Sequence, residues 1–230
     1  MTKRQLAFAV SCIAILLVSG CVSAPPLSAP TFSPAPSEEP TTTPTPQVAD
    51  TVRLSAEQIE LLQGETELAT APLSDTAESV ATLSDHFGAP EVENFVPDPD
   101  NYCARAQTIY RWGENLQLTA PVDDFSWPSA YDVRIFGPSL GTVEHPDVRL
   151  EAAGRVAVGD DVSDLVAASP DMMETYEGTD GVTGGLFILQ RGFSSYTVDP
   201  NAIWGVAAVT ENNLVTILGS PMPIRSSIDC

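Results

Sequence analysis

The order of apolar and polar residues divides the chain into three segments. Residues 6–18 form an almost unbroken apolar run, and residues 22–50 are rich in proline, serine and threonine. From residue 51 onward, short apolar stretches recur at the spacings typical of strands and helices. We therefore expect a signal segment, a tether and a folded region of 180 residues, which is long enough to bury a sizeable core.

The folded region opens with a predicted hairpin. Residues 52–62 and 67–73 contain short alternating stretches on either side of a turn at Gly64. The alternation places apolar side chains on one face of each strand. Residues 56–62 also fit a short helix, so this alternative stays open.

A helix is predicted over residues 74–87. Ser74 or Asp75 can serve as its N-cap, and Asp75 with Glu78 resembles a capping box. Gly88 then ends the helix, as a glycine after the last helical residue commonly does. The apolar face consists of residues at three- and four-residue spacing: Ala77, Val80, Leu83 and Phe87.

The remaining apolar stretches predict strands and a second, shorter helix, so the order of a helix followed by strands is repeated. The asparagines of the last turn tolerate positive φ, which favours a hairpin there. The predicted elements are strands over 108–118 (kinked at Gly113), 131–137 and 186–191, an extended stretch over 148–158, a helix over 162–169 that Gly159-Asp160-Asp161 caps, and a hairpin of 202–209 and 214–218 around Asn212 and Asn213.

Each half of the folded region thus holds one amphipathic helix followed by antiparallel strands. The sequence predicts the α+β class, with two small units in which a helix packs on an antiparallel sheet. The expected domains are a signal peptide at 1–20, a lipidated cysteine and disordered Pro-rich tether at 21–50, a first unit at 51–147 and a second unit at 148–230.

The charge of the chain excludes some classes of partner. The sequence has 10 basic and 31 acidic residues, a net charge of −21, whereas binding to nucleic acid needs clustered lysine and arginine. Cleavage before Cys21 would remove Lys3 and Arg4, leaving 8 arginines against 31 acidic residues and a net charge of −23. Without lysine, the mature chain has no means of Schiff-base or P-loop chemistry.

The N-terminus resembles a bacterial lipoprotein signal. Lys3 and Arg4 precede an apolar run that is too short to span a bilayer as a stable helix and matches an export signal. The following Val18-Ser19-Gly20-Cys21 resembles a lipobox, in which the thiol of Cys21 receives a diacylglycerol. Two acyl chains suffice for stable attachment, so we expect a lipid anchor on the extracytoplasmic face of the cell membrane. A secretory signal with a coincidental cysteine, or an uncleaved anchor, is the alternative.

The tether contains 8 prolines and 9 serines or threonines in 29 residues. Such a segment buries too little apolar surface to offset the entropy of ordering it, and its prolines favour extended polyproline II. At about 3.1 Å per residue its upper reach is on the order of 90 Å. It is interpreted as a passive spacer, or alternatively as a stalk glycosylated among Thr41–Thr45.

Four motifs resemble those of actinobacterial envelope lipoproteins: Phe87-Gly88-Ala89-Pro90, Tyr110-x-Trp112-Gly113, Gly159-Asp160-Asp161-Val162 and Val209-x-x-x-Asn213-x-Val215-x-x-Leu218. Those proteins carry tandem repeats related to the SmpA/OmlA domain of the outer-membrane assembly machinery and to the β-lactamase inhibitory protein. The resemblance implies protein recognition rather than catalysis, and it assigns no binding residue. The stretch at 121–141 departs from the pattern and lengthens the first unit.

Two cysteines remain in the folded region, Cys103 and Cys230. An even pair outside the cytoplasm is read first as a disulfide. It would close a loop of about 128 residues and stabilise the fold by up to roughly 5 kcal/mol in the chain-entropy picture. Free thiols or an intermolecular bridge are the alternatives.

No catalytic residue, metal site or cofactor is predicted. His86 and His145 are isolated in the sequence, and Gly137-Pro138-Ser139-Leu140-Gly141 is a poor imitation of a nucleophile elbow. The acidic stretch at Asp98 fails the calcium-loop pattern, because its sixth position is Cys103 and its twelfth is not acidic. Most carboxylates are interpreted as a solvated face.

Aromatic residues are the remaining candidates for recognition. The hypothesis is an exposed platform formed by Tyr110, Trp112, Trp127 and Tyr131, with Trp127 beside Pro128 the strongest candidate. Alternation places Tyr110 and Trp112 on one face of a strand. The alternative is that Trp112 and Trp204 belong to the core.

The sequence therefore predicts a non-enzymatic, lipid-anchored envelope protein whose folded region binds an envelope or secreted protein. The alternatives are a hydrolase that uses carboxylates on wall or glycan substrates, and a purely structural envelope protein. In a Gram-positive cell the anchor lies in the plasma membrane, whereas in a Gram-negative cell Val22 would permit sorting to the outer membrane.

Overall fold

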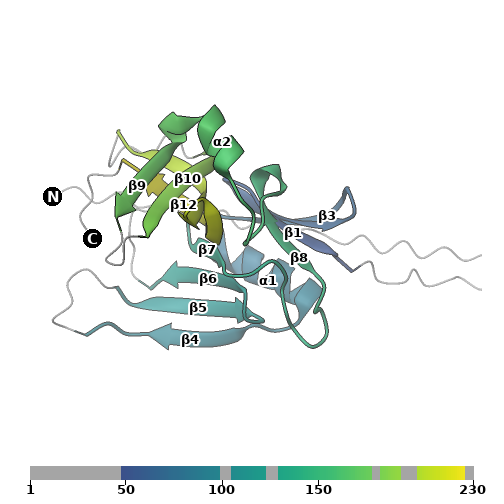
Figure 1. Cartoon of the computed structure of the whole chain (residues 1–230). Helices are drawn as coiled ribbons and strands as arrows, with labels where there is room; N and C mark the ends of the chain where they lie inside the picture. Colours follow the sequence, from purple (N-terminus) through teal and green to yellow (C-terminus); the bar gives the residue numbers. More distant parts are fainter. Residues whose placement is uncertain (1–47, 99–104, 123–128, 178–181, 193–200, 226–230) are drawn as a thin grey trace, which may run out of the picture. The chain divides into compact units, whose positions relative to one another are not determined.

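The computed structural model describes residues 48–98, 105–122, 129–177, 182–192 and 201–225, and all of them belong to one compact unit (Figure 1). The candidate residues Cys21, Cys103, Trp127 and Cys230 lie outside these ranges. The strands are β1 (Thr51–Leu54), β2 (Gln58–Gln63), β3 (Thr66–Pro72), β4 (Glu91–Phe95), β5 (Gln107–Trp112), β6 (Leu116–Pro121), β7 (Asp132–Ile135), β8 (Arg149–Ala152), β9 (Met173–Glu177), β10 (Thr183–Arg191), β11 (Ile203–Glu211) and β12 (Leu214–Ile224). The helices are α1 (Thr76–Phe87) and α2 (Ser163–Ala168), with 3₁₀ turns at Ala153–Arg155 and Pro170–Met172.

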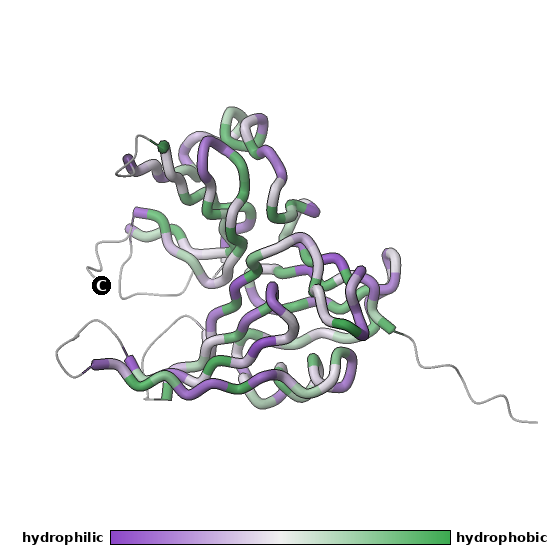
Figure 2. The backbone as a smooth tube through the Cα atoms, turned by 60° about the horizontal axis from the view of Figure 1, so that its bottom comes forward, coloured by the Kyte–Doolittle hydropathy of each residue, from purple (hydrophilic) through white to green (hydrophobic). Residues whose placement is uncertain are grey.

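The strands form two sheets. One has four strands in the order β3-β2-β1-β8, and the other has eight in the order β4-β5-β6-β7-β12-β11-β10-β9. All pairings are antiparallel except that of β1 with β8, which is parallel. Figure 2 shows hydrophilic and hydrophobic residues following one another along the strands, as expected where one face of a sheet meets the core.

The predicted α+β class with two helix-on-sheet units is wrong. Of the described residues, 51% lie in strands and 16% in helical segments, so the fold is mostly β. The two halves also exchange strands: β8 extends the sheet of β1 to β3, and β12 pairs with β7. The physical reason is that a lone hairpin leaves unpaired backbone N–H and C=O groups at its edges and an uncovered apolar face, and a strand from the other half can cover both.

Helix α1 is the predicted helix, and it begins and ends as its capping residues indicate. Asp75 is the N-cap, and its Oδ1 accepts from the Glu78 backbone N at 3.0 Å. Gly88 ends the helix with φ at +81°. Leu83 and Phe87 are buried as predicted, but Ser79 replaces the exposed Ala77 on the inner face and donates through Oγ to the Pro72 carbonyl at 2.8 Å.

Helix α2 has the predicted place but contributes less to packing. It has no buried residue, and Val162 just before it is buried instead. The Oδ1 of Asp161 accepts from the Ser163 backbone N at 2.8 Å, so this aspartate satisfies a free N–H at the start of the helix. The hydrogen bond from the Ser163 hydroxyl, together with this backbone bond, lowers the pKa of the Asp161 carboxyl.

The predicted strand over 108–118 is instead the hairpin β5–β6. Gly113 lies in its turn with φ at +63°, and a Cβ there would meet the Leu140 carbonyl oxygen at 2.2 Å. The position therefore requires glycine. The last predicted hairpin is confirmed as β11–β12, with Asn212 and Asn213 at φ of 52° and 65°.

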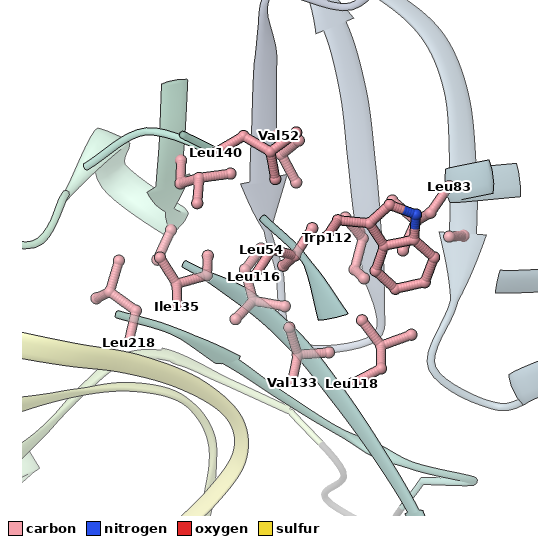
Figure 3. Close-up of a cluster of buried hydrophobic side chains, with 14 of the residues drawn as sticks. Val52, Leu54, Leu83, Trp112, Leu116, Leu118, Val133, Ile135, Leu140 and Leu218 are labelled. Carbon is pink, nitrogen blue, oxygen red and sulfur yellow. The ribbon is translucent and has the colours of Figure 1, made fainter. Parts of the chain in front are cut away.

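The main core is formed by residues from both sheets and α1 (Figure 3). β6 shows the pattern clearly, because Leu116, Leu118 and Ala120 are buried while the residues between them are half-buried. The side chains meet those of β1, β7 and α1, as the close-up shows. Labelled members of this core are Val52, Leu54, Leu83, Trp112, Leu116, Leu118, Val133, Ile135, Leu140 and Leu218.

An ion network lies on the four-stranded sheet. Arg53 of β1 stands opposite Glu60 of β2 and Glu151 of β8. The Arg53 Nε lies 2.7 Å from one Glu151 oxygen, and the Arg149 Nε lies 2.9 Å from the other. Glu151 is only 2% exposed, so these two arginines are what compensates its burial.

Candidate interaction surface

Two of the aromatic candidates are core residues and do not form the expected platform. Trp112 is 2% exposed, and its Nε1 donates to the Gly88 carbonyl at 2.9 Å. Tyr131 is fully buried, and its hydroxyl donates to the Pro72 carbonyl at 3.3 Å. Burial is the main reason that the pKa of the Tyr131 hydroxyl is raised far above its usual value. Both polar groups are thus satisfied inside the protein.

Tyr110 is the candidate that lies at a boundary. It is half-buried on β5, packs against the main core, and stands opposite Val92 of β4 and Leu118 of β6. Tyr110 and Trp112 share one face of β5, as alternation predicts. The side chain therefore connects the core to the exposed strand β4.

The most exposed strand is β4, at one end of the eight-stranded sheet (Figure 1). All five of its residues are exposed, and large apolar side chains are exposed on both of its faces and at the neighbouring strand ends. The Phe95–Gln107–Pro121 row crosses β4, β5 and β6. The exposed apolar residues here are Val92 (52%), Phe95 (40%), Val96 (79%) and Val122 (62%).

The sequence contained a signal for β4 that was missed. Residues 91–96 read Glu-Val-Glu-Asn-Phe-Val, which alternates polar and apolar positions over its first three residues and stops at Pro97. The segment is short and acidic, and neither property is typical of strands in a folded core. An edge strand, however, is commonly short and charged.

The outer face of this part of the sheet is polar. Glu93 accepts from the Arg111 guanidinium at 2.7 Å, and the Gln117 amide donates to the Thr119 hydroxyl at 3.0 Å. Glu91 stands opposite Arg111 in the register but has no ion pair among the described residues. The surface thus combines apolar side chains with acidic ones.

Farther along this face, Asp132 is a carboxyl with a shifted pKa. It stands opposite Thr119, and its Oδ2 lies 3.0 Å from the Arg134 guanidinium. Burial raises the pKa of the Asp132 carboxyl, and the charge of Arg134 and a hydrogen bond from Thr119 offset this only in part.

Asp132→Asn is expected to remove part of the pH dependence of stability. Because the folded pKa of Asp132 lies above its ordinary value of 3.8, the folded chain binds more protons than the unfolded chain between the two values. The stabilising contribution is therefore full below the unfolded pKa and is lost as pH rises through the folded pKa. Urea titrations between about pH 7 and about pH 4 should show wild type gaining stability relative to the variant as pH falls. An unchanged difference would contradict the assignment.

The imidazole rings of His86 and His145 both lie close to the Phe87 ring. The ring centroids of His86 and Phe87 are 6.2 Å apart, and those of Phe87 and His145 are 5.6 Å apart in an edge-to-face arrangement. Each imidazole thus contacts an aromatic ring. Within the described ranges, no three His, Cys, Asp or Glu residues are grouped to hold a metal ion.

No helix in the described part of the chain is long and apolar enough to cross a membrane. Comparisons with protein-family models, curated proteins and solved structures found no match to this chain.

Proposed function

We propose that this chain is a lipoprotein, anchored by lipid on Cys21 to the extracytoplasmic face of the cell membrane, and that its β-rich domain binds an envelope or secreted protein. Binding does not involve catalysis or a cofactor. The apolar export signal, the lipobox-like motif and the proline-rich segment support the anchor. The acidic charge of the chain fits a protein partner and not a nucleic acid.

The observation that carries the binding function is that β4 and the adjoining strand ends expose apolar side chains on both faces of the sheet, with Val92 on one face of β4 and Phe95 on the other. Single exposed apolar side chains are normal on a soluble protein, whereas a group of them surrounded by polar residues marks an interaction surface. Phe95 and Val96 are adjacent in the chain, and Val122 lies at the end of β6, two strands away. The acidic residues Glu91 and Glu93 lie beside them.

We expect the double variant Phe95→Ser/Val96→Ser to lose its partner. The full lipidated chain would be expressed in its own host, cross-linked in intact membranes, captured and compared with wild type by quantitative mass spectrometry. Loss of an aromatic anchor at the centre of an interface should lower recovery of the specific partner by about tenfold or more. Both side chains are exposed, so the fold should be unaffected.

The matched control is Val143→Ser/Leu165→Ser, which removes apolar side chains of similar exposure (99% and 44%) elsewhere on the domain. A partner that is recovered equally by wild type and both variants would count against the β4 surface. A Cys21→Ser arm tests the anchor, because this variant should leave the membrane fraction. Full retention in the membrane would contradict lipid attachment at Cys21.

A further inference from the structure

β4 is an outer strand of the eight-stranded sheet, and no described residue hydrogen-bonds to the backbone of its second edge. The outer strand β8 differs, because the loop before it bonds to it through Leu140 N to Val148 O at 2.8 Å and Leu150 N to Pro138 O at 2.9 Å. Among the described residues, β4 pairs with β5 alone, and all of its residues are exposed.

The pairing of β4, β5 and β6 shows which backbone groups of β4 point toward its open edge. Val122 N donates to Ala106 O at 3.0 Å, and Phe136 N donates to Asn115 O at 2.9 Å. Bonding direction alternates along antiparallel strands, and the register of β4, β5 and β6 has no bulge. The backbones of residues 107, 109 and 111 therefore face β4, and the N–H and C=O groups of Val92 and Asn94 point outward.

The side chains along the edge define what could pair with it. Glu91, Glu93 and Phe95 lie on one face of β4, and Val92 and Asn94 lie on the other. Opposite residues in an added strand would be close neighbours of these side chains. Two basic residues and one aromatic residue would complement the first face, with valine and threonine on the second.

From this edge we infer that an extended, basic segment of the partner adds to β4 as an antiparallel strand. The inference rests on the proposed function and names how the partner binds. From its N-terminus to its C-terminus, the five central residues of the segment are tyrosine, threonine, arginine, valine and lysine, or residues of the same kind. The antiparallel orientation continues the order of β4, β5 and β6, which are antiparallel to one another. Main-chain bonds give affinity and alternate side chains give specificity, as in other strand-addition complexes.

Charge argues against a second copy of this chain as the occupant. Two copies paired along β4 would bring Glu91 and Glu93 of both chains to one seam, and each mature chain carries a net charge of −23. Acidic residues on an edge strand also prevent aggregation. The same residues thus repel like strands and attract a basic one.

The test uses a fluorescent nine-residue peptide with the stated central residues and the full chain in detergent micelles. Fluorescence anisotropy should show saturable binding that weakens with added salt. Asn94→Pro should bind at least tenfold more weakly, because the ring removes an outward N–H and blocks the edge. The matched control Asn94→Ala keeps the N–H, loses only the side-chain contact with Thr108, and should bind within about twofold of wild type.

A second measurement leaves the protein unchanged. N-methylation of the peptide's threonine or valine, whose N–H groups would face β4, should abolish binding, whereas N-methylation of its arginine should not. Equal effects of the three methylations would overturn strand addition, even if Asn94→Pro failed to fold. Binding of a charge-reversed peptide as tight as that of the basic peptide would overturn the charge assignment.

The results can separate an error in the strand-addition mode from an error in the proposed function. If Phe95→Ser/Val96→Ser loses its cellular partner but the peptide does not bind, the surface is an interface and the strand-addition mode is wrong. A wild-type dimer in sedimentation that Asn94→Pro converts to a monomer would identify a second copy as the occupant and refute the inference.

Discussion

Trp112→Ala should lower the free energy of unfolding by about 4 kcal/mol. The indole is 2% exposed and lies among Leu54, Leu116 and Leu118 in the main core (Figure 3). Truncation would leave a cavity between the two sheets, and it would also leave the Gly88 carbonyl without its donor. The cavity is the larger cost because it removes packing contacts, and the lost hydrogen bond adds to it.

Urea unfolding followed by circular dichroism would measure this effect without relying on tryptophan fluorescence. Trp112→Phe separates the two causes, since it keeps most of the apolar volume and loses the hydrogen bond. We expect it to cost about 1–2 kcal/mol. As a surface control, Val143→Ala should change stability by less than about 0.5 kcal/mol. A loss below about 1 kcal/mol for Trp112→Ala would show that this side chain is not central to the core.

Arg53→Met is expected to destabilise the domain by about 3 kcal/mol. The substitution removes the cation closest to the buried Glu151 carboxylate, whose remaining partner, Arg149, has a side chain that is 53% exposed. An uncompensated charge in a buried site costs more than the ion pair contributes when intact. Arg149→Met should cost less, about 1 kcal/mol, because Arg53 stays in place.

The double variant Arg53→Met/Glu151→Met provides the decisive control. If the loss comes from an unpaired buried charge, removing the charge as well should restore stability to within about 1 kcal/mol of wild type. Thermal and urea unfolding of Arg53→Met, Glu151→Met and the double variant would give the coupling energy between the two positions. Additive losses would mean that the cost comes from packing of the arginine side chain and not from charge.

Sequence alone was sufficient where the signals are local. The capping pair Asp75 and Glu78 located α1 because the side-chain bond joins residues three apart. Asn212 and Asn213 located the β11–β12 turn because few other residues adopt positive φ there. Each of these elements is specified by neighbours in the chain.

Where partners are distant in the chain, the sequence left the arrangement undetermined. The repeated order of helix and strands suggested two separate units, but β1 pairs with β8, and the Arg53–Glu151 pair joins residues 98 positions apart. Nothing local to β1 indicates that its neighbour is parallel and comes from the other half. The same holds for the pairing of β7 with β12.

The candidate surface was misplaced for a related reason. Alternation showed that Tyr110 and Trp112 share a face, but it does not say which face of a strand meets the core. Which face of β5 meets the core depends on α1, because the Trp112 indole donates a hydrogen bond to the Gly88 carbonyl at the end of that helix. β4 was missed because an edge strand needs few apolar residues.

The position of β1 has a mechanical consequence. The chain enters the domain through Ala49, which is 1% exposed, and Asp50, which bonds to Leu62 and Arg149 on either side. β1 is therefore held between β2 and β8 and not at a free edge. A force that reaches the domain from its N-terminal side acts along β1. It loads the hydrogen bonds between β1 and β2 and between β1 and β8 in shear, so these bonds share the force instead of breaking one after another. A domain drawn toward or away from a membrane through this strand would keep its shape while it is under tension.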